Sequence, residues 1–236
     1  MKIIDLKSTE FITKLPDLYC PNLEELYLED CKNLIEVHES FGFLEKLKVW
    51  NFYSCSQLQI LPSTLMLKSL ECFEIERCPR LEKFPDIHPK MNCLKYLNLS
   101  YSDIRGLPPS LLYLTGLDQF CGERIIGFLC LTQLNLCGAR INMELDSWMQ
   151  PNYFPVLTFL YLSYTGIVTI PESISRFTTL QELYISDCKK LREIPRLPQS
   201  IRTVDAQNCD RLDTQSSSRL LNQVSLSFSL SLKVKL

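Results

Sequence analysis

One spacing of apolar residues recurs along most of this chain and constrains its fold more than any other feature. Its clearest copy runs from Leu23 through Leu26 and Leu28 to a small residue, Cys31, and then to Leu34. The copies begin at Leu23, Leu47, Leu70, Leu94, Leu117, Leu131, Leu157, Leu180 and Ile201. Apart from an interval of 14 residues after Leu117, they follow one another at intervals of 21 to 26 residues. A chain with this period stacks similar units rather than folding around a single globular core.

A period of about 20 to 29 residues with the pattern L-x-x-L-x-L-x-x-N/C-x-L is typical of leucine-rich repeats. The x-L-x-L part of each copy predicts a short strand whose leucines point into the stack, while the residues between them face outward. We therefore predict an α/β solenoid. It is a leucine-rich-repeat horseshoe with short parallel strands on the concave face and irregular or 3₁₀ returns on the convex face.

The position three residues after the second strand leucine turns the chain, so its side chain must be small and buried. A thiol or hydroxyl at this position can also satisfy backbone groups in the turn. We assign this structural turn role to Cys31, Cys55, Cys78, Ser102, Thr165, Cys188 and Cys209. Five of the eleven cysteines are thereby explained as turn residues rather than as nucleophiles or metal ligands.

The returns that follow the turns carry a second motif. An apolar residue followed by proline recurs, and a serine then begins a Ser-apolar-x-x-apolar pattern at Ser40, Ser110 and Ser173. Proline cannot extend a strand ladder, so it fits an irregular return. The serine pattern predicts a short helical or 3₁₀ turn with serine as its N-cap.

The pattern divides the chain into two parts. Residues 1–213 are predicted to form a repeat domain of about ten units, of which the first is truncated and those near 117–156 are irregular. The degenerate copy at Leu117 and the expanded copy after it predict a tolerated loop insertion, with a dedicated binding loop as the alternative. Residues 214–236 are predicted to form a post-repeat tail, for which disorder is one alternative; for its last part, residues 225–236, in which Ser and Leu alternate, an added edge strand is another.

The concave face is the candidate functional site. The third, fifth and seventh residues of each copy should be exposed there, and of these 27 positions seven are acidic and none is basic. An acidic surface with interleaved aromatic residues favours a protein partner that is basic on its contact surface, and it repels phosphate backbones. The predicted docking residues are Glu25, Tyr27, Glu29, Glu74, Glu76, Tyr96, Phe159, Tyr161, Glu182, Tyr184 and Asp205. The alternative is a solvated face on which the acids aid solubility.

Other function classes find little support in the composition. The formal net charge is −2, which argues against nucleic-acid binding through bulk charge. The two histidines, the absence of C-x-x-C and the absence of G-x-x-x-x-G-K-[ST] predict no catalytic residue, no metal site and no cofactor or small-molecule substrate. The absence of a signal peptide, of a long apolar stretch and of a disulfide framework predicts a cytoplasmic or nucleo-cytoplasmic protein without a membrane span.

Three stretches carry a family resemblance: residues 21–34, 180–191 and 197–209. They resemble the repeat region of plant intracellular disease-resistance receptors, within the class that has an N-terminal TIR domain. That resemblance implies a sensing and autoinhibitory repeat array. The TIR and nucleotide-switch chemistry of such receptors is not carried over, because this sequence has no phosphate-binding loop to support it.

The predicted function is a non-enzymatic recognition module of plant innate immunity. It would sense a pathogen protein or restrain a receptor's switch domain through the concave face. A substrate-binding leucine-rich-repeat adaptor of a ubiquitin ligase, or another signalling scaffold, is the alternative; the first would need an F-box-like helical segment, which is not visible before residue 3. Cysteine catalysis is disfavoured, because no histidine lies close in sequence to Cys72, Cys93, Cys121, Cys130 or Cys137.

Overall fold

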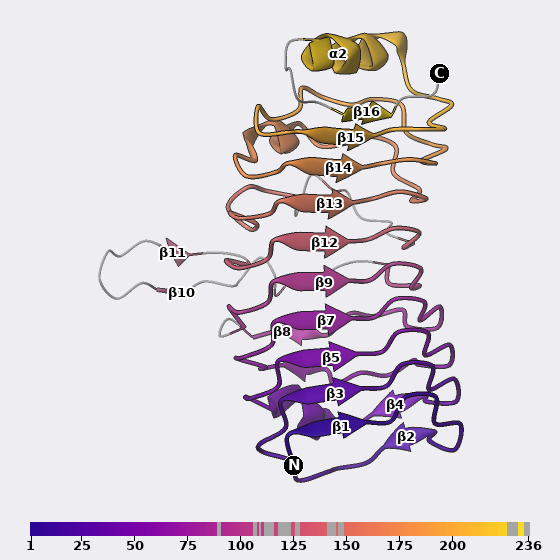
Figure 1. The fold of residues 1–236 in the computed structure, drawn as a ribbon, viewed down its shortest axis with the longest axis vertical. Coiled ribbons are helices and arrows are strands. Elements are labelled where there is room, and N and C mark those ends of the chain that lie inside the picture. Colours follow the sequence, from indigo (N-terminus) through magenta and orange to yellow (C-terminus); the bar gives the residue numbers. More distant parts are fainter. Residues whose placement is uncertain are drawn as a thin grey trace.

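Ten short strands stack into one parallel sheet that runs along the long axis of the molecule (Figure 1). The computed structural model describes residues 1–88, 91–105, 108, 110, 116–117, 124–125, 128–140, 145, 149–225 and 231–233. The strands of this sheet, in spatial order, are β1 (Ile3–Asp5), β3 (Glu25–Tyr27), β5 (Val49–Asn51), β7 (Cys72–Glu74), β9 (Tyr96–Asn98), β12 (Gln133–Asn135), β13 (Phe159–Tyr161), β14 (Glu182–Tyr184), β15 (Thr203–Asp205) and β16 (Ser231–Lys233). This arrangement confirms the predicted leucine-rich-repeat solenoid.

The segments that return the chain from one strand to the next contain only short elements within the described residues. Two pairs of two-residue parallel strands lie here: β2 (Lys14–Leu15) with β4 (Glu36–Val37), and β6 (Thr64–Leu65) with β8 (Asp86–Ile87). Two 3₁₀ helices, η1 (Glu39–Phe43) and η3 (Glu172–Arg176), follow the turns of their units. These returns match the predicted irregular and 3₁₀ character of the convex face.

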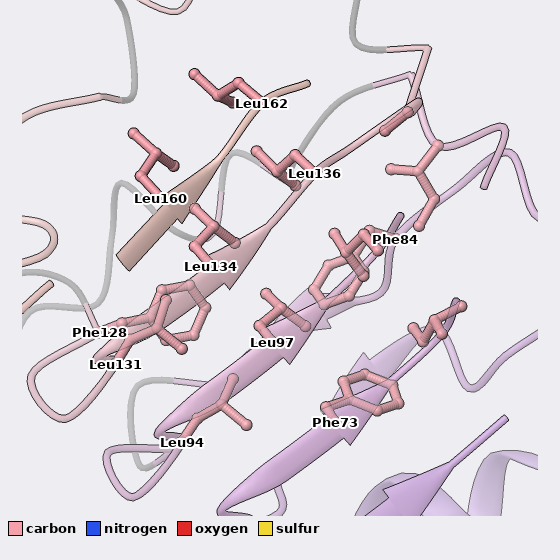
Figure 2. Packing of buried hydrophobic residues seen from close by; sticks show 14 of the residues in the cluster. Phe73, Phe84, Leu94, Leu97, Phe128, Leu131, Leu134, Leu136, Leu160 and Leu162 are labelled. Carbon is pink, nitrogen blue, oxygen red and sulfur yellow. The ribbon is translucent and has the colours of Figure 1, made fainter. Parts of the chain in front are cut away.

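The core is a column of side chains contributed by the same position of each strand. On β5 and β7 this column is aromatic: Trp50 is stacked on Phe73 with ring centroids 5.3 Å apart, and Phe41 and Phe52 also pack on Trp50. From β9 onward leucines take over, and Figure 2 shows Leu97, Leu134 and Leu160 on successive turns. The column is continuous because each unit buries its apolar side chains against both neighbours.

The degenerate copy at Leu117 does not supply a strand to the sheet, so its prediction as a repeat unit is wrong. β9 pairs directly with β12, with Tyr96 opposite Gln133. Gly116–Leu117 (β10) and Arg124–Ile125 (β11) instead pair with each other, antiparallel, in a hairpin that projects from the stack (Figure 1). An interval of 14 residues is too short for a full turn of this solenoid. Three concave-face positions assigned to that copy, Gln119, Cys121 and Glu123, lie outside the described residues.

The serines of the returns are not the N-caps that the sequence predicts. His38 caps η1, and its Nδ1 accepts the backbone N–H of Ser40 at 3.2 Å, while Pro171 precedes η3 without a side-chain cap bond. Ser173 lies one residue inside its helix, and its hydroxyl donates to the carbonyl of Met149 in the preceding turn at 2.5 Å. From this position the hydroxyl ties neighbouring units together instead of closing its own helix.

Each turn after the sheet strands from β1 to β15 holds one residue in the left-handed backbone region. The non-glycine residues with positive φ are Ser8, Asp30, Ser54, Arg77, Tyr101, Tyr164, Asp187 and Asn208. In the unit of β12 this residue is Gly138, where a Cβ atom would lie 2.6 Å from Cδ1 of Tyr101. The left-handed residue reverses the chain immediately before the small turn position, which is why that position recurs so regularly.

The segment after residue 213 forms helix α2 (Thr214–Ser225) and strand β16, so residues 214–225 are not the disordered tail that was one alternative. Asp213 caps α2, with its Oδ1 accepting the N–H of Ser216 at 2.5 Å, and Leu220 is buried. β16 extends the sheet, with Leu232 opposite Val204, as the edge-strand alternative proposed. No helix in the described part of the chain is long and apolar enough to cross a membrane.

Candidate functional site

The parallel register aligns equivalent side chains into three rows on the concave face. The first row contains Ile3, Glu25, Val49, Cys72, Tyr96, Gln133, Phe159, Glu182 and Thr203. The middle row contains Asp5, Tyr27, Asn51, Glu74, Asn98, Asn135, Tyr161, Tyr184 and Asp205. The last row, two residues further on, contains Lys7, Glu29, Tyr53, Glu76, Ser100, Cys137, Ser163, Ser186 and Gln207. All eleven predicted docking residues lie in these rows.

The first unit contributes a basic residue to the concave face, for which the sequence pattern predicts no basic residues. Lys7 occupies the last row, with its Nζ 3.2 Å from Oε1 of Glu29 and 4.5 Å from the centre of the Tyr27 ring. The truncated first copy was not included in the predicted rows, which is why Lys7 was missed. One acid of the face, Glu29, is therefore partly neutralised from within.

A carboxylate pair lies near the middle of the sheet. Nδ2 of Asn98 donates to Oε1 of Glu74 at 2.5 Å and to Oε2 of Glu76 at 3.0 Å. Burial raises the pKa of Glu74 to about 7, and the neighbouring charge of Glu76 adds to the effect. Asn98 itself is 2% exposed, and Ser100 beside it is buried as well. The sequence predicts that every position of the three rows is exposed. That prediction is wrong for Asn98 and Ser100, which are buried.

The tyrosines of the C-terminal half form a fixed, half-buried group. The Tyr161 and Tyr184 rings are stacked, with centroids 4.7 Å apart and planes 9° from parallel. The Tyr184 hydroxyl donates to Oε2 of Glu182 at 2.7 Å, which raises the pKa of the tyrosine to about 12. Nε2 of Gln133 donates to the Tyr161 hydroxyl at 3.2 Å. Side chains held in this way lose little further freedom when a partner binds.

The same tyrosine–glutamate arrangement occurs at the N-terminal end of the face. The Tyr27 hydroxyl donates to Oε2 of Glu25 at 2.9 Å, and this bond raises the pKa of Tyr27. Each such pair presents an aromatic ring and a carboxylate from alternate positions of one strand. Rings and acids therefore alternate over the surface rather than forming separate patches.

An alternating line of charges borders the face, one residue before the first row. It consists of Lys2, Glu24, Lys48, Glu71 and Lys95, and we call it the edge ladder. Glu24 lies 2.7 Å from the ammonium groups of both Lys2 and Lys48, and Glu71 lies 2.6 Å from that of Lys95. Hydrogen bonds from its two lysines lower the pKa of Glu24 to about 2.

Several acids of the face, Glu25, Glu74 and Glu182 among them, differ from those of the edge ladder. Among the residues that the structure describes, no lysine, arginine or histidine nitrogen lies within 4.0 Å of the carboxylates of Glu25, Glu74 and Glu182. Glu25 and Glu182 accept hydrogen bonds from the Tyr27 and Tyr184 hydroxyls, so no cation offsets their charge, whereas the raised pKa leaves Glu74 only partly charged near pH 7. This distinction between paired and unpaired acids could not be seen in the sequence.

The turn residues lie under the edge of the face where the strands end. The thiols of Cys31, Cys55, Cys78, Cys188 and Cys209 donate to carbonyls of the preceding unit at 3.0 to 3.2 Å. The hydroxyls of Ser102 and Thr165 instead donate to carbonyls of their own units, Leu99 and Leu162, at 2.6 Å. Burial raises the pKa of Cys188 and brings that of Cys209 to about 11, so these thiols stay protonated and unreactive.

The two cysteines of the concave face are poor nucleophiles. Burial raises the pKa of the concave thiols Cys72 and Cys137 to about 11, which removes them as nucleophiles near neutral pH. Within the described residues, no three histidine, cysteine, aspartate or glutamate side chains are grouped so as to hold a metal ion.

Sequence reasoning missed a groove on the returns. Its volume is about 750 Å³, and its lining includes Ile60, Pro62, Phe84, Pro85 and Pro108. Ile60 is 49% exposed there. Its sequence signal is a set of prolines one unit apart, for which the irregular course of the returns is a sufficient explanation.

Comparisons with known proteins agree with this fold and with the resemblance drawn from the sequence. The family profile described as Leucine Rich Repeat matches residues 93–114. The disease resistance-like protein DSC1 of Arabidopsis thaliana is 26% identical over 223 residues, and the TMV resistance protein N of Nicotiana glutinosa is 29% identical over 197 residues. These alignments cover 84% and 83% of this chain but only 17% and 14% of the two relatives.

A solved structure supports the fold independently. The leucine-rich repeat domain of the type III effector XopL is 18% identical to this chain and superposes with a TM-score of 0.71, covering 98% of this chain and 75% of that domain. At this identity the likeness concerns the fold alone. The chain is thus a leucine-rich-repeat solenoid whose sequence is similar, over most of its length, to plant disease-resistance proteins.

Proposed function

We propose that this chain is a protein-recognition module of plant innate immunity. Its concave face would dock a protein that is basic on its contact surface, either a pathogen protein or the switch domain of a receptor that the module restrains. The role in defence rests on the similarity to disease-resistance proteins, of which the chain spans less than a fifth. The role in docking rests on the geometry of the face.

The observation that carries the proposal is the set of acids without cationic partners. Glu24 and Glu71 of the edge ladder are matched by lysines at 2.6 to 2.7 Å, whereas Glu25, Glu74 and Glu182 have no such match in the described residues. A face serving only solubility would have no reason to combine unmatched acids with fixed tyrosine rings. Arginine and lysine side chains of a partner would pair with the acids and lie over the rings.

The same charges disfavour nucleic acid as the ligand. Phosphate backbones are bound by rows of lysine and arginine, and the strand part of this face presents acids instead. Tyrosine is suited to a protein interface because its ring and its hydroxyl are both used in contacts. We therefore assign the concave face to a protein partner.

A binding assay with a defined probe tests the electrostatic part. The probe is a synthetic peptide that alternates arginine and tyrosine, and its counterpart has glutamate in place of arginine. The double variant Glu74→Lys, Glu76→Lys should weaken binding of the basic peptide by about tenfold or more, since each close charge pair contributes on the order of 1 kcal/mol. Isothermal titration calorimetry measures the affinity, and Glu193→Lys on a return is the matched control.

Salt separates this explanation from nonspecific stickiness. Raising the ionic strength from about 0.05 M to about 0.5 M should weaken binding to the unaltered chain and have little effect on the double variant. Equal affinity of the unaltered chain and the double variant at both salt concentrations would refute docking through these acids. Equal loss in the Glu193→Lys control would show that net charge, rather than the face, determines binding.

A further inference from the structure

Two cysteines occupy the same position on adjacent turns of the solenoid. Tyr96 of β9 is paired with Gln133 of β12, so Cys93 and Cys130, each three residues earlier, are equivalent. The equivalence extends through the segments before the strands. Leu94 and Leu131 are both buried, as Figure 2 shows for these adjacent turns, and Met91 and Phe128 are both 1% exposed.

This equivalence puts the two cysteines within disulfide range. Neighbouring strands of a sheet lie about 4.8 Å apart, and a disulfide joins residues whose Cα atoms are about 4.4 to 6.8 Å apart. The electrostatics of Lys95 agree with this placement of the two thiols. Its pKa is raised mainly by the hydrogen bond to Glu71, and to a smaller extent by the charges of both Cys130 and Cys93. Both thiols are therefore near one ammonium group.

Access distinguishes this pair from the turn cysteines. Cys55 and Cys78 also occupy equivalent positions on adjacent turns, but both are fully buried and their thiols donate to backbone carbonyls. Cys93 is half-buried and Cys130 is exposed. An oxidant can therefore reach Cys93 and Cys130 but not Cys55 and Cys78.

We propose that Cys93 and Cys130 form a redox-sensitive dithiol that closes to a disulfide. With hydrogen peroxide as oxidant, the two thiols give up their hydrogens, a sulfur–sulfur bond forms, the oxygen–oxygen bond breaks and two waters leave. With oxidised glutathione, one thiol attacks the glutathione disulfide, the second thiol displaces the bound glutathione, and two reduced glutathione molecules leave.

The site lies at the junction where the repeat is interrupted. β9 and β12 are neighbours in space, but their first residues, Tyr96 and Gln133, are 37 positions apart in the chain. The β10–β11 hairpin belongs to the sequence between these two strands. A disulfide between Cys93 and Cys130 would tie the two sides of this junction together. It would also close the intervening segment into a loop, which stabilises the folded state by constraining the unfolded chain.

Oxidation of the purified chain with a graded glutathione redox buffer tests the proposal. Mass spectrometry of a non-reduced digest should find the peptides of Cys93 and Cys130 linked in a monomer, and dithiothreitol should separate them. The unfolding temperature should rise by about 5 °C or more on oxidation and return on reduction. Cys93→Ser and Cys130→Ser should each abolish the link and the rise.

The matched control is Cys20→Ser. Cys20 is half-buried like Cys93, but the equivalent residue on the next turn is Leu44, so this variant should retain the link. Separate glutathione adducts on Cys93 and Cys130 without a link between them would overturn the proposal. A link to any other cysteine, or a dimer joined through Cys130, would overturn it as well.

Discussion

At the scale of single residues, Glu74 shows how a concave sheet changes the behaviour of a carboxylate. Its side chain is covered by Tyr96 and Asn98 of the next strand and lies beside Glu76. Burial raises its pKa to about 7 from an ordinary value of 4.5. Between these two pH values the folded chain holds a proton that the unfolded chain releases, so stability falls as the pH rises through this window.

Glu74→Gln should remove this loss. We expect the variant to be about as stable as the unaltered chain at pH 5, and more stable by up to about 2 kcal/mol at pH 8, because the amide carries no charge to bury. Urea unfolding at a series of pH values measures the difference. The control Glu193→Gln, on a return, should leave the pH dependence of the unfolding free energy unchanged. If Glu74→Gln showed the same pH dependence as the unaltered chain, the raised pKa would not belong to Glu74.

Much of the site could be predicted from the sequence at this scale, and the reason is the period. Once the strand leucines are recognised, the alternation of a strand places Glu25 and Tyr27 on the concave face without further information. The pairing state of Glu74 could not be predicted in this way. It depends on Asn98, which is 24 residues away in the chain, and on the rotamers that bring the two together at 2.5 Å.

At the scale of elements, α2 closes the C-terminal end of the repeats through contacts that begin at its cap. Asp213 accepts the N–H of Ser216, and hydrogen bonds from the Ser216 side chain and then from its backbone lower the pKa of Asp213. Ser216 in turn accepts the N–H of Ile194 at 2.9 Å, which joins the helix to the preceding turn. The cap therefore supports both the helix and its attachment.

Asp213→Ala should lower the unfolding temperature, because the first turn of α2 loses its acceptor. A lowered pKa means that the stabilisation is present above the ordinary pKa of aspartate and is lost as the pH falls through the lowered value. The deficit of the alanine variant should therefore shrink as the pH falls below the ordinary value of 3.8. Asp213→Asn keeps a capping oxygen and should retain most of the stability at pH 7, as followed by circular dichroism. An alanine variant with an unchanged unfolding temperature would exclude the cap.

The elements differ in how far their sequence determined them. The strands were predictable because each copy repeats the same constraint. The β10–β11 hairpin was not, since Leu117 and its neighbours imitate the first residues of a copy without the length that a turn of the solenoid needs. The helix α2 was also missed, although an aspartate directly before a helix, here Asp213, is a recognisable N-cap residue.

At the scale of the whole molecule, stability is distributed along a line. Each unit contacts only its neighbours, so damage in one unit should spread only a short distance. Trp50 tests this, because it is fully buried and packs on Phe41, Phe52 and Phe73. Toward the C-terminus, the leucines of the column begin two strands away from Trp50, with Leu97 of β9.

Trp50→Ala should cost about 3 to 5 kcal/mol in the N-terminal units. Hydrogen exchange followed by mass spectrometry should show faster exchange in β3, β5 and β7, while β14 and β15 stay protected. Leu183→Ala, in β14, is the reciprocal control and should reverse the pattern. Equal acceleration in all strands would mean that the array unfolds as one cooperative body.

The edge ladder has a consequence for how many units this array can gain or lose. Its charges alternate from one unit to the next, from Lys2 to Glu24, Lys48, Glu71 and Lys95. Removal of the single unit 23–46 would set Lys2 beside Lys48, whereas removal of the two units 23–69 would set Lys2 beside Glu71. In the N-terminal half it therefore matters whether the number of units changes by an even or an odd number. Recombination between its repeats preserves the charge pattern when it changes their number by two and breaks it when it changes their number by one.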